Sequence, residues 1–286
     1  MGVRFAHPAA AMDPPAEPVA DDRPIPPEVL NPDLWYPPAE ALPDVSELVT
    51  EDGAPVDNIH SEKTMRMLTE PLYSSWDPGY PFIALANVGV FFKEGTPAVV
   101  PDALLALHVR LPENLFPKIN RSYYVWKYGR RPDATVEIVS NKQGGEADEK
   151  IEKYAEIGVA NYIINDPELH LSDRVLRHFR LNGTRYQEQR VDDALVMPDV
   201  GLGMKIWRGR FETTDGDWLR WTDLRGNLIP TGAERADAEA ERAEAEAKRA
   251  EAEAKRAEAE AKRADAEANR AAKLLEQLRR AGIEPE

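Results

Sequence analysis

A glutamate set inside an apolar run is the feature that most limits how this chain can fold. In the segment ATVEIVS, Thr135, Val136, Ile138 and Val139 surround Glu137, and these residue types favour a buried β-strand. Because side chains alternate along a strand, Glu137 shares a face with Thr135 and Val139, while the other two face the opposite way. A carboxylate in such a strand is costly to bury unless it is hydrogen-bonded, paired with a base or bound to a cation.

Two kinds of partner could compensate Glu137. A lysine or arginine would form a structural ion pair, whereas a divalent metal would need a second acid from a neighbouring strand. Asp102 is such an acid, because it stands at the start of the apolar run VVPDALLALHV upstream. Pro101 favours an extended entry to this run, but Asp102 taken alone is equally typical of a turn residue that caps backbone donors. These residues by themselves leave both kinds of partner open.

Composition divides the 286 residues into three parts. Residues 1–44 are rich in proline and acid, which predicts a disordered arm. Residues 45–233 contain the strand-like runs and five of the six tryptophans, so we expect one folded domain there. Residues 234–286 form a highly charged, alanine-rich segment.

The runs between residues 45 and 233 predict the order helix, strand, strand, strand, helix, strand. The first helix is expected to end or bend at Pro71, and the second to span Glu146 to Ile157, with Gly158 as its stop. Further strand candidates lie near 174–181, 184–190 and 217–221. This order indicates an α/β or α+β fold in which helices flank one mixed central sheet.

The segment from residue 234 onward repeats the heptad AKRAEAE almost without error. Alanine is the best helix former, and glutamates stand four residues before lysines in the favourable direction, so we expect a helix on the order of 70 Å long. Two interpretations stay open for it: a coiled coil that joins several copies of the chain, or a solitary spacer helix. An alanine seam buries little surface, so we expect weak association unless Leu274, Leu275 and Leu278 anchor it.

Charge and composition exclude several classes of protein. The formal net charge is −15, yet residues 59–233 carry 24 acidic and 22 basic residues, which is not the strong basic excess typical of proteins that hold nucleic acid tightly. The absence of cysteine excludes disulfides and thiolate metal sites and fits a cytoplasmic location. No run approaches the roughly 20 apolar residues of a membrane span, and we find no secretory signal.

Five segments in fixed order carry a resemblance to a known family. They are DNIHSEKTMRMLTEPL, VVPDALLAL, PDATVEIVSN, DEKIEKYAEIGVANYIINDPE and WLRWTDLRGNLIPTGAERA. With them, residues 45–230 resemble the Uma-type family of putative restriction endonucleases, a branch of the P-D-(D/E)-x-K nuclease superfamily. The resemblance implies a restriction-endonuclease-like core, to which the charged tail is added.

The resemblance also implies the residues of a site. The metal-binding acids would be Asp102 and Glu137, with the backbone carbonyl of Ile138 as a further ligand, and oxygen ligands of this kind suit Mg²⁺ or Mn²⁺. The superfamily lysine is replaced by Val139, and the family pattern transfers its role to Lys150 on the following helix.

Other residues on nearby segments are weaker candidates for the same site. Lys142 and Lys153 are rivals of Lys150 for the role of the catalytic lysine. On the first helix, Glu62 could reach the metal from the side, and His60 matches a histidine common in the family.

The resulting expectation is a metal-dependent endonuclease that hydrolyses DNA. The alternative is a weakly active or inactive nuclease-like module for nucleic-acid binding or assembly, made oligomeric by its helical tail.

Overall fold

The structure is a computed structural model that describes residues 58–140 and 149–282. The chain divides into two compact units, Met1–Gly232 and Ala233–Glu286. The predicted arm and Lys142 lie outside the described residues.

The first unit is built on a six-stranded mixed sheet with the order β1-β3-β5-β6-β7-β8. Its strands are Phe82–Ala86, Ala103–Leu107, Ala134–Ile138, Asn161–Asn165, Leu176–Asn182 and Arg185–Gln189. Neighbours pair antiparallel except β5 and β6, which are parallel. These two are joined through the helix α3, Glu149–Ile157, as a parallel pair requires a crossover.

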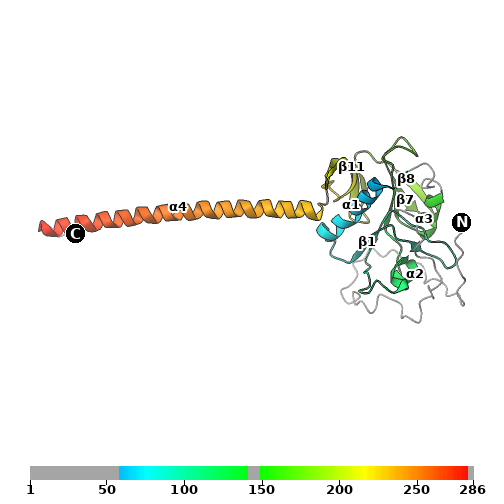
Figure 1. The fold of residues 1–286 in the computed structure, drawn as a ribbon, viewed down its shortest axis with the longest axis horizontal. Helices are drawn as coiled ribbons and strands as arrows, with labels where there is room; N and C mark the ends of the chain where they lie inside the picture. Colours follow the sequence, from blue (N-terminus) through cyan, green and yellow to red (C-terminus); the bar gives the residue numbers. More distant parts are fainter. Residues whose placement is uncertain (1–57, 141–148, 283–286) are drawn as a thin grey trace. The chain divides into compact units, whose positions relative to one another are not determined.

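Two helices cover opposite faces of this sheet (Figure 1). Helix α1, Ile59–Ser75, contributes Met65, Leu68 and Leu72 to a core that also contains Val136 and Ile138 of β5. Helix α3 contributes Tyr154 and Ile157 to a second core on the other face. This core also contains Val139, Tyr162 and Ile164. The predicted alternation along β5 and the mixed sheet flanked by helices are therefore confirmed.

Helix α3 ends where the sequence predicts, at Ile157. Gly158 follows with a φ of +84°, a left-handed conformation that glycine adopts without a steric penalty. Its N–H donates to the carbonyl of Tyr154 at 2.9 Å. The predicted start at Glu146 lies outside the described residues.

Helix α1 does not end at Pro71, which corrects part of the sequence expectation. The helix continues through Pro71 to Ser75, although proline removes a backbone donor. Tertiary contacts beyond the proline offset this loss. Leu72 is completely buried, and the Tyr73 hydroxyl accepts from the N–H of Ala84 at 2.9 Å and donates to its carbonyl at 3.1 Å.

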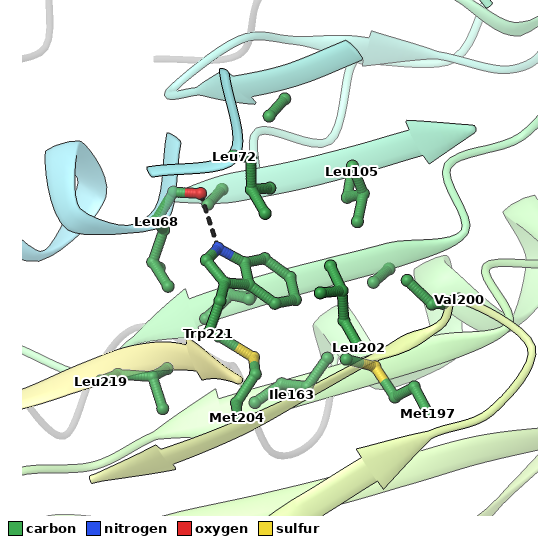
Figure 2. Packing of buried hydrophobic residues seen from close by; sticks show 14 of the residues in the cluster. Leu68, Leu72, Leu105, Ile163, Met197, Val200, Leu202, Met204, Leu219 and Trp221 are labelled. Atoms are coloured by element: carbon green, nitrogen blue, oxygen red, sulfur yellow. Dashed lines mark hydrogen bonds between the residues drawn. The ribbon is translucent and has the colours of Figure 1, made fainter. Parts of the chain in front are cut away.

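Three late strands form a second sheet in addition to the central mixed sheet. Their order is β11-β10-β9, with bounds Leu195–Met197 for β9, Leu202–Phe211 for β10 and Thr214–Thr222 for β11. Met204, Leu219 and Trp221 of this sheet join the core around α1. Figure 2 shows this packing and the indole N–H of Trp221 donating to the Leu68 carbonyl, at 2.8 Å. The 217–221 candidate is part of β11, while the sequence analysis missed β10.

Shorter elements complete this unit. They are β2, Val90–Phe91, which pairs parallel with β4, Tyr123–Tyr124; the 3-10 helix η4, Lys118–Asn120; and α2, Val125–Tyr128.

Helix α4, Gly232–Arg280, is the predicted long C-terminal helix and has no buried residue. The three predicted ion pairs are formed, each 2.6 Å between ammonium and carboxylate: Lys248–Glu244, Lys255–Glu251 and Lys262–Glu258. Glutamates also flank the alanine seam on both sides, as in Glu251 and Glu253 around Ala250 and Ala254. Like charges at both flanks oppose pairing of two copies through this seam.

A membrane-crossing helix is not found within residues 58–140 and 149–282, since every helix there is too short or too polar.

Deletion of residues 234–286 should leave the first unit folded, because the core residues all precede this segment. We expect a truncated chain ending at Ala233 to keep the strand signal in circular dichroism, and its thermal midpoint to change by no more than about 2 °C. Light scattering on the full chain and the truncated chain should give the same number of subunits. Loss of the strand signal on truncation would contradict this expectation.

Candidate active site

Glu137 is buried in the middle of the sheet and receives a hydrogen bond on each carboxylate oxygen. Its side chain is only 1% exposed. The ammonium of Lys150 lies 2.7 Å from Oε2, and the hydroxyl of Tyr154 donates to Oε1 at 2.6 Å. Both partners come from α3 and stand four residues apart, so one helical face holds both oxygens. The strand therefore receives the compensating group that its sequence requires.

Asp102 lies beside Glu137 at the same end of the sheet. Strand β3 pairs antiparallel with β5, with Ala103 opposite Val136. Continuing this register by one residue places Asp102, just before β3, opposite Glu137 of β5. The Oδ2 atom of Asp102 accepts from the backbone N–H of Ile138 at 2.6 Å. The N–H and C=O groups of one residue in an extended strand point to the same edge, so the Ile138 carbonyl also points toward the β3 side.

The backbone of Asp102 is held by the residue that follows β1. The N–H of Asn87 donates to the Asp102 carbonyl at 3.1 Å, and Asn87 has a left-handed φ of +54°. Asparagine adopts this conformation more readily than most residues, and here it lets the chain leave β1 next to the start of β3.

The electrostatics of the site disfavour a charged Glu137 when no cation is bound. Burial raises the pKa of the Glu137 carboxyl to about 8, although Lys150 opposes this shift and the charge of Asp102 adds to it. Burial, and then the charge of Glu137, raise the pKa of Tyr154 well above its usual value, so the hydroxyl remains a donor. A positive charge between the carboxyl groups of Asp102 and Glu137 would stabilise both of them as anions.

Among the candidate lysines, Lys150 contacts Glu137 and remains 26% exposed, so its ammonium lies between the buried carboxylate and solvent. Lys153 is exposed on another side of α3. Lys142 lies outside the described residues.

The two α1 candidates make contacts of their own. Glu62 pairs with Arg66, at 2.7 Å between Oε1 and Nε, and His60 stacks on Trp218 with ring centroids 5.3 Å apart.

Tyr154 is the site residue that the sequence analysis did not select. The available signal was its spacing of four residues from Lys150, which puts both side chains on the face of the helix that looks toward the sheet.

The oxygen donors of this site suit a hard divalent cation, though they are few. Two carboxylates and one carbonyl are ligands that Mg²⁺ or Mn²⁺ accepts, with water or substrate oxygens completing the shell. No cluster of three or more His, Cys, Asp or Glu side chains that could hold a metal occurs in the described parts of the chain. Any ion here would therefore depend on the acid pair and the Ile138 carbonyl.

Comparison with known proteins adds two findings. The family model Uma2, described as a putative restriction endonuclease, matches residues 52–208. Among solved structures, this chain is similar to a putative nuclease belonging to DUF820 from Anabaena variabilis ATCC 29413, with 19% identity and a TM-score of 0.37 over 50% of this chain and 74% of that one. No curated protein matches this chain.

The raised pKa of Glu137 predicts a pH-dependent stability in the metal-free protein. An acid with a pKa near 4.5 when unfolded and about 8 when folded binds more protons in the native state between these values, so stability falls as the pH rises through this window. The loss is at most about 5 kcal/mol. Glu137→Gln removes the ionisation, so this variant should unfold at a higher urea concentration than wild type at pH 8.5 but not at pH 5, both in EDTA.

The matched control for this experiment is Glu156→Gln, the same chemical change at an exposed position of α3. An equal gain in both variants at pH 8.5 would contradict the assignment to Glu137.

Proposed function

Because the chain belongs to the Uma2 family of putative restriction endonucleases, we propose that it is a divalent-metal-dependent endonuclease that hydrolyses DNA phosphodiester bonds. The observation that carries the proposal is the acid pair: Asp102 immediately precedes β3, Glu137 lies near the end of the neighbouring β5, and the buried acid is held by a lysine and a tyrosine. A structural ion pair alone needs no second acid at this point.

The ligands of the ion in this proposal are Asp102, Glu137 and the Ile138 carbonyl, and the ion is Mg²⁺ or Mn²⁺. When bound, such an ion would stabilise negative charge on the phosphate and lower the pKa of a coordinated water. The affinity should rise with pH, since ligating carboxyl groups must lose their protons.

Lys150 has the second role in the proposal. Its ammonium contacts Glu137 Oε2 and is partly exposed, so it lies where a phosphate would approach the acid pair. A positive charge fixed at that place stabilises the negative charge that develops on the phosphate during hydrolysis. Lys150 therefore replaces the lysine that Val139 does not provide.

The partners follow from the same chemistry. The substrate is DNA, and because the central part of the chain is nearly neutral, contacts near the site have to supply much of the affinity. We place the reaction in the cytoplasm, in keeping with a chain that has no cysteine.

Homo-oligomer formation through α4 is the alternative to the solitary helix that we favour. Leu274 and Leu275 are 61% and 42% exposed and could anchor two copies, but the glutamates along the alanine seam oppose this contact.

A cleavage assay on supercoiled plasmid DNA with Mg²⁺ or Mn²⁺ tests the activity. We expect wild type to nick or linearise the plasmid and EDTA to abolish this. Glu137→Gln and Asp102→Asn should each reduce the rate by about 100-fold or more, because each removes a charged ligand. Lys150→Met should reduce the cleavage rate by about 100-fold. The control variant Lys153→Met, on the same helix, should cleave at the wild-type rate.

Two results would overturn parts of the proposal. Cleavage by Glu137→Gln at the wild-type rate would reject the site. Binding of DNA by wild type without cleavage under any of these conditions would favour the alternative, a nuclease-like module without activity.

A further inference from the structure

We propose that Tyr154 is a positioning residue of this site: its buried hydroxyl fixes Oε1 of Glu137 and so orients the carboxylate that would bind the ion. The proposal rests on the proposed function and adds a residue to it.

The contact has the geometry of a strong hydrogen bond. The hydroxyl and Oε1 are 2.6 Å apart, within the roughly 2.5–2.7 Å range of O–H···O⁻ bonds to ionised acceptors. Tyr154 and Glu137 are both completely buried, so water does not compete for either atom. A buried carboxylate oxygen that lost this donor would have to rotate or take up a proton.

The tyrosine itself has little freedom to move. Its carbonyl accepts from the N–H groups of Gly158 and Val159, at 2.9 and 3.0 Å, where α3 ends. Its ring lies against Tyr162, with centroids 5.0 Å apart. A donor held at both its backbone and its ring can fix the orientation of the group that it contacts.

The two donors to Glu137 divide the carboxylate into an inner and an outer oxygen. Tyr154 is completely buried, so Oε1 points into the core, whereas Lys150 is 26% exposed, so Oε2 points toward the accessible side. Tyr154 thereby keeps Oε2 at the side from which an ion and a phosphate must enter. Partners that orient a ligating group in this way typically change metal affinity or activity by about 10- to 100-fold.

The test is Mn²⁺ binding to the full chain by isothermal titration calorimetry, without nucleic acid. Tyr154→Phe keeps the ring and removes only the hydroxyl, so we expect a folded protein whose Kd for Mn²⁺ is about 10- to 100-fold weaker than that of wild type. Excess Mn²⁺ should restore most of the cleavage rate of this variant. The Kd is measured at a temperature at which metal-free Tyr154→Phe is fully folded, because Mn²⁺ also stabilises a destabilised fold by mass action.

Tyr186→Phe is the matched control. Its hydroxyl donates to the Val159 carbonyl at 2.7 Å, and its ring also contacts Tyr162, at 5.8 Å. The control variant should bind Mn²⁺ within twofold of wild type. Wild-type affinity in Tyr154→Phe, or an equal loss in both variants, would overturn the proposal.

A crystal structure of metal-free Tyr154→Phe separates this inference from the nuclease proposal. If wild type neither binds Mn²⁺ nor cleaves DNA, the nuclease proposal fails, and the position of Glu137 still decides the role of Tyr154. A carboxylate rotated away from its wild-type orientation would support a positioning role, and an unmoved carboxylate would overturn it.

Discussion

The burial of the Glu137 carboxylate is the interaction on which the rest of the site depends. A carboxyl group buried in a β-sheet requires hydrogen-bond partners of its own, and here both come from α3. This requirement fixes the rotation of α3 about its axis, because Lys150 and Tyr154 have to face the sheet together. It also limits where α3 can end, since Tyr154 occupies its last turn, just before Gly158.

The same arrangement explains why β5 and β6 are parallel while the other neighbours in the central sheet are antiparallel. The crossover that contains α3 returns the chain to the starting end of β5, which keeps the helix over Glu137. Strand β3 then brings Asp102 to the opposite side of β5, at the same end of the sheet. The acid pair thus arises from one antiparallel and one parallel pairing around a single strand.

The opposite face of the sheet has a supporting role. Helix α1 and the sheet β9–β11 form a continuous apolar core (Figure 2). Strand β5 contributes Val136 and Ile138 to this core. Strand β5 is held there by hydrophobic packing, which leaves its other face to carry the polar group. Helix α4 contributes no residue to these cores, so it does not determine the fold of the first unit.

Local patterns in the sequence determined much of this protein. Alternation along ATVEIVS assigned Glu137 to a face, glycine at 158 ended a helix, and glutamate–lysine spacing predicted the pairs along α4. Each of these depends on residues within about one or two turns of one another. Asp102 and Glu137 could be paired only by resemblance to a family, because no local rule says that two residues 35 positions apart in the sequence lie side by side.

Tertiary structure decided what local rules could not. Pro71 should end or bend α1, yet the helix continues to Ser75, because burial of Leu72 and the hydrogen bonds of Tyr73 with Ala84 stabilise the segment beyond it. Nothing local in the sequence predicts the partner of Tyr154, because only the packing of α3 on the sheet directs its hydroxyl to Glu137. A side chain's periodicity fixes its face, but its hydrogen-bond partner depends on what the fold places opposite it.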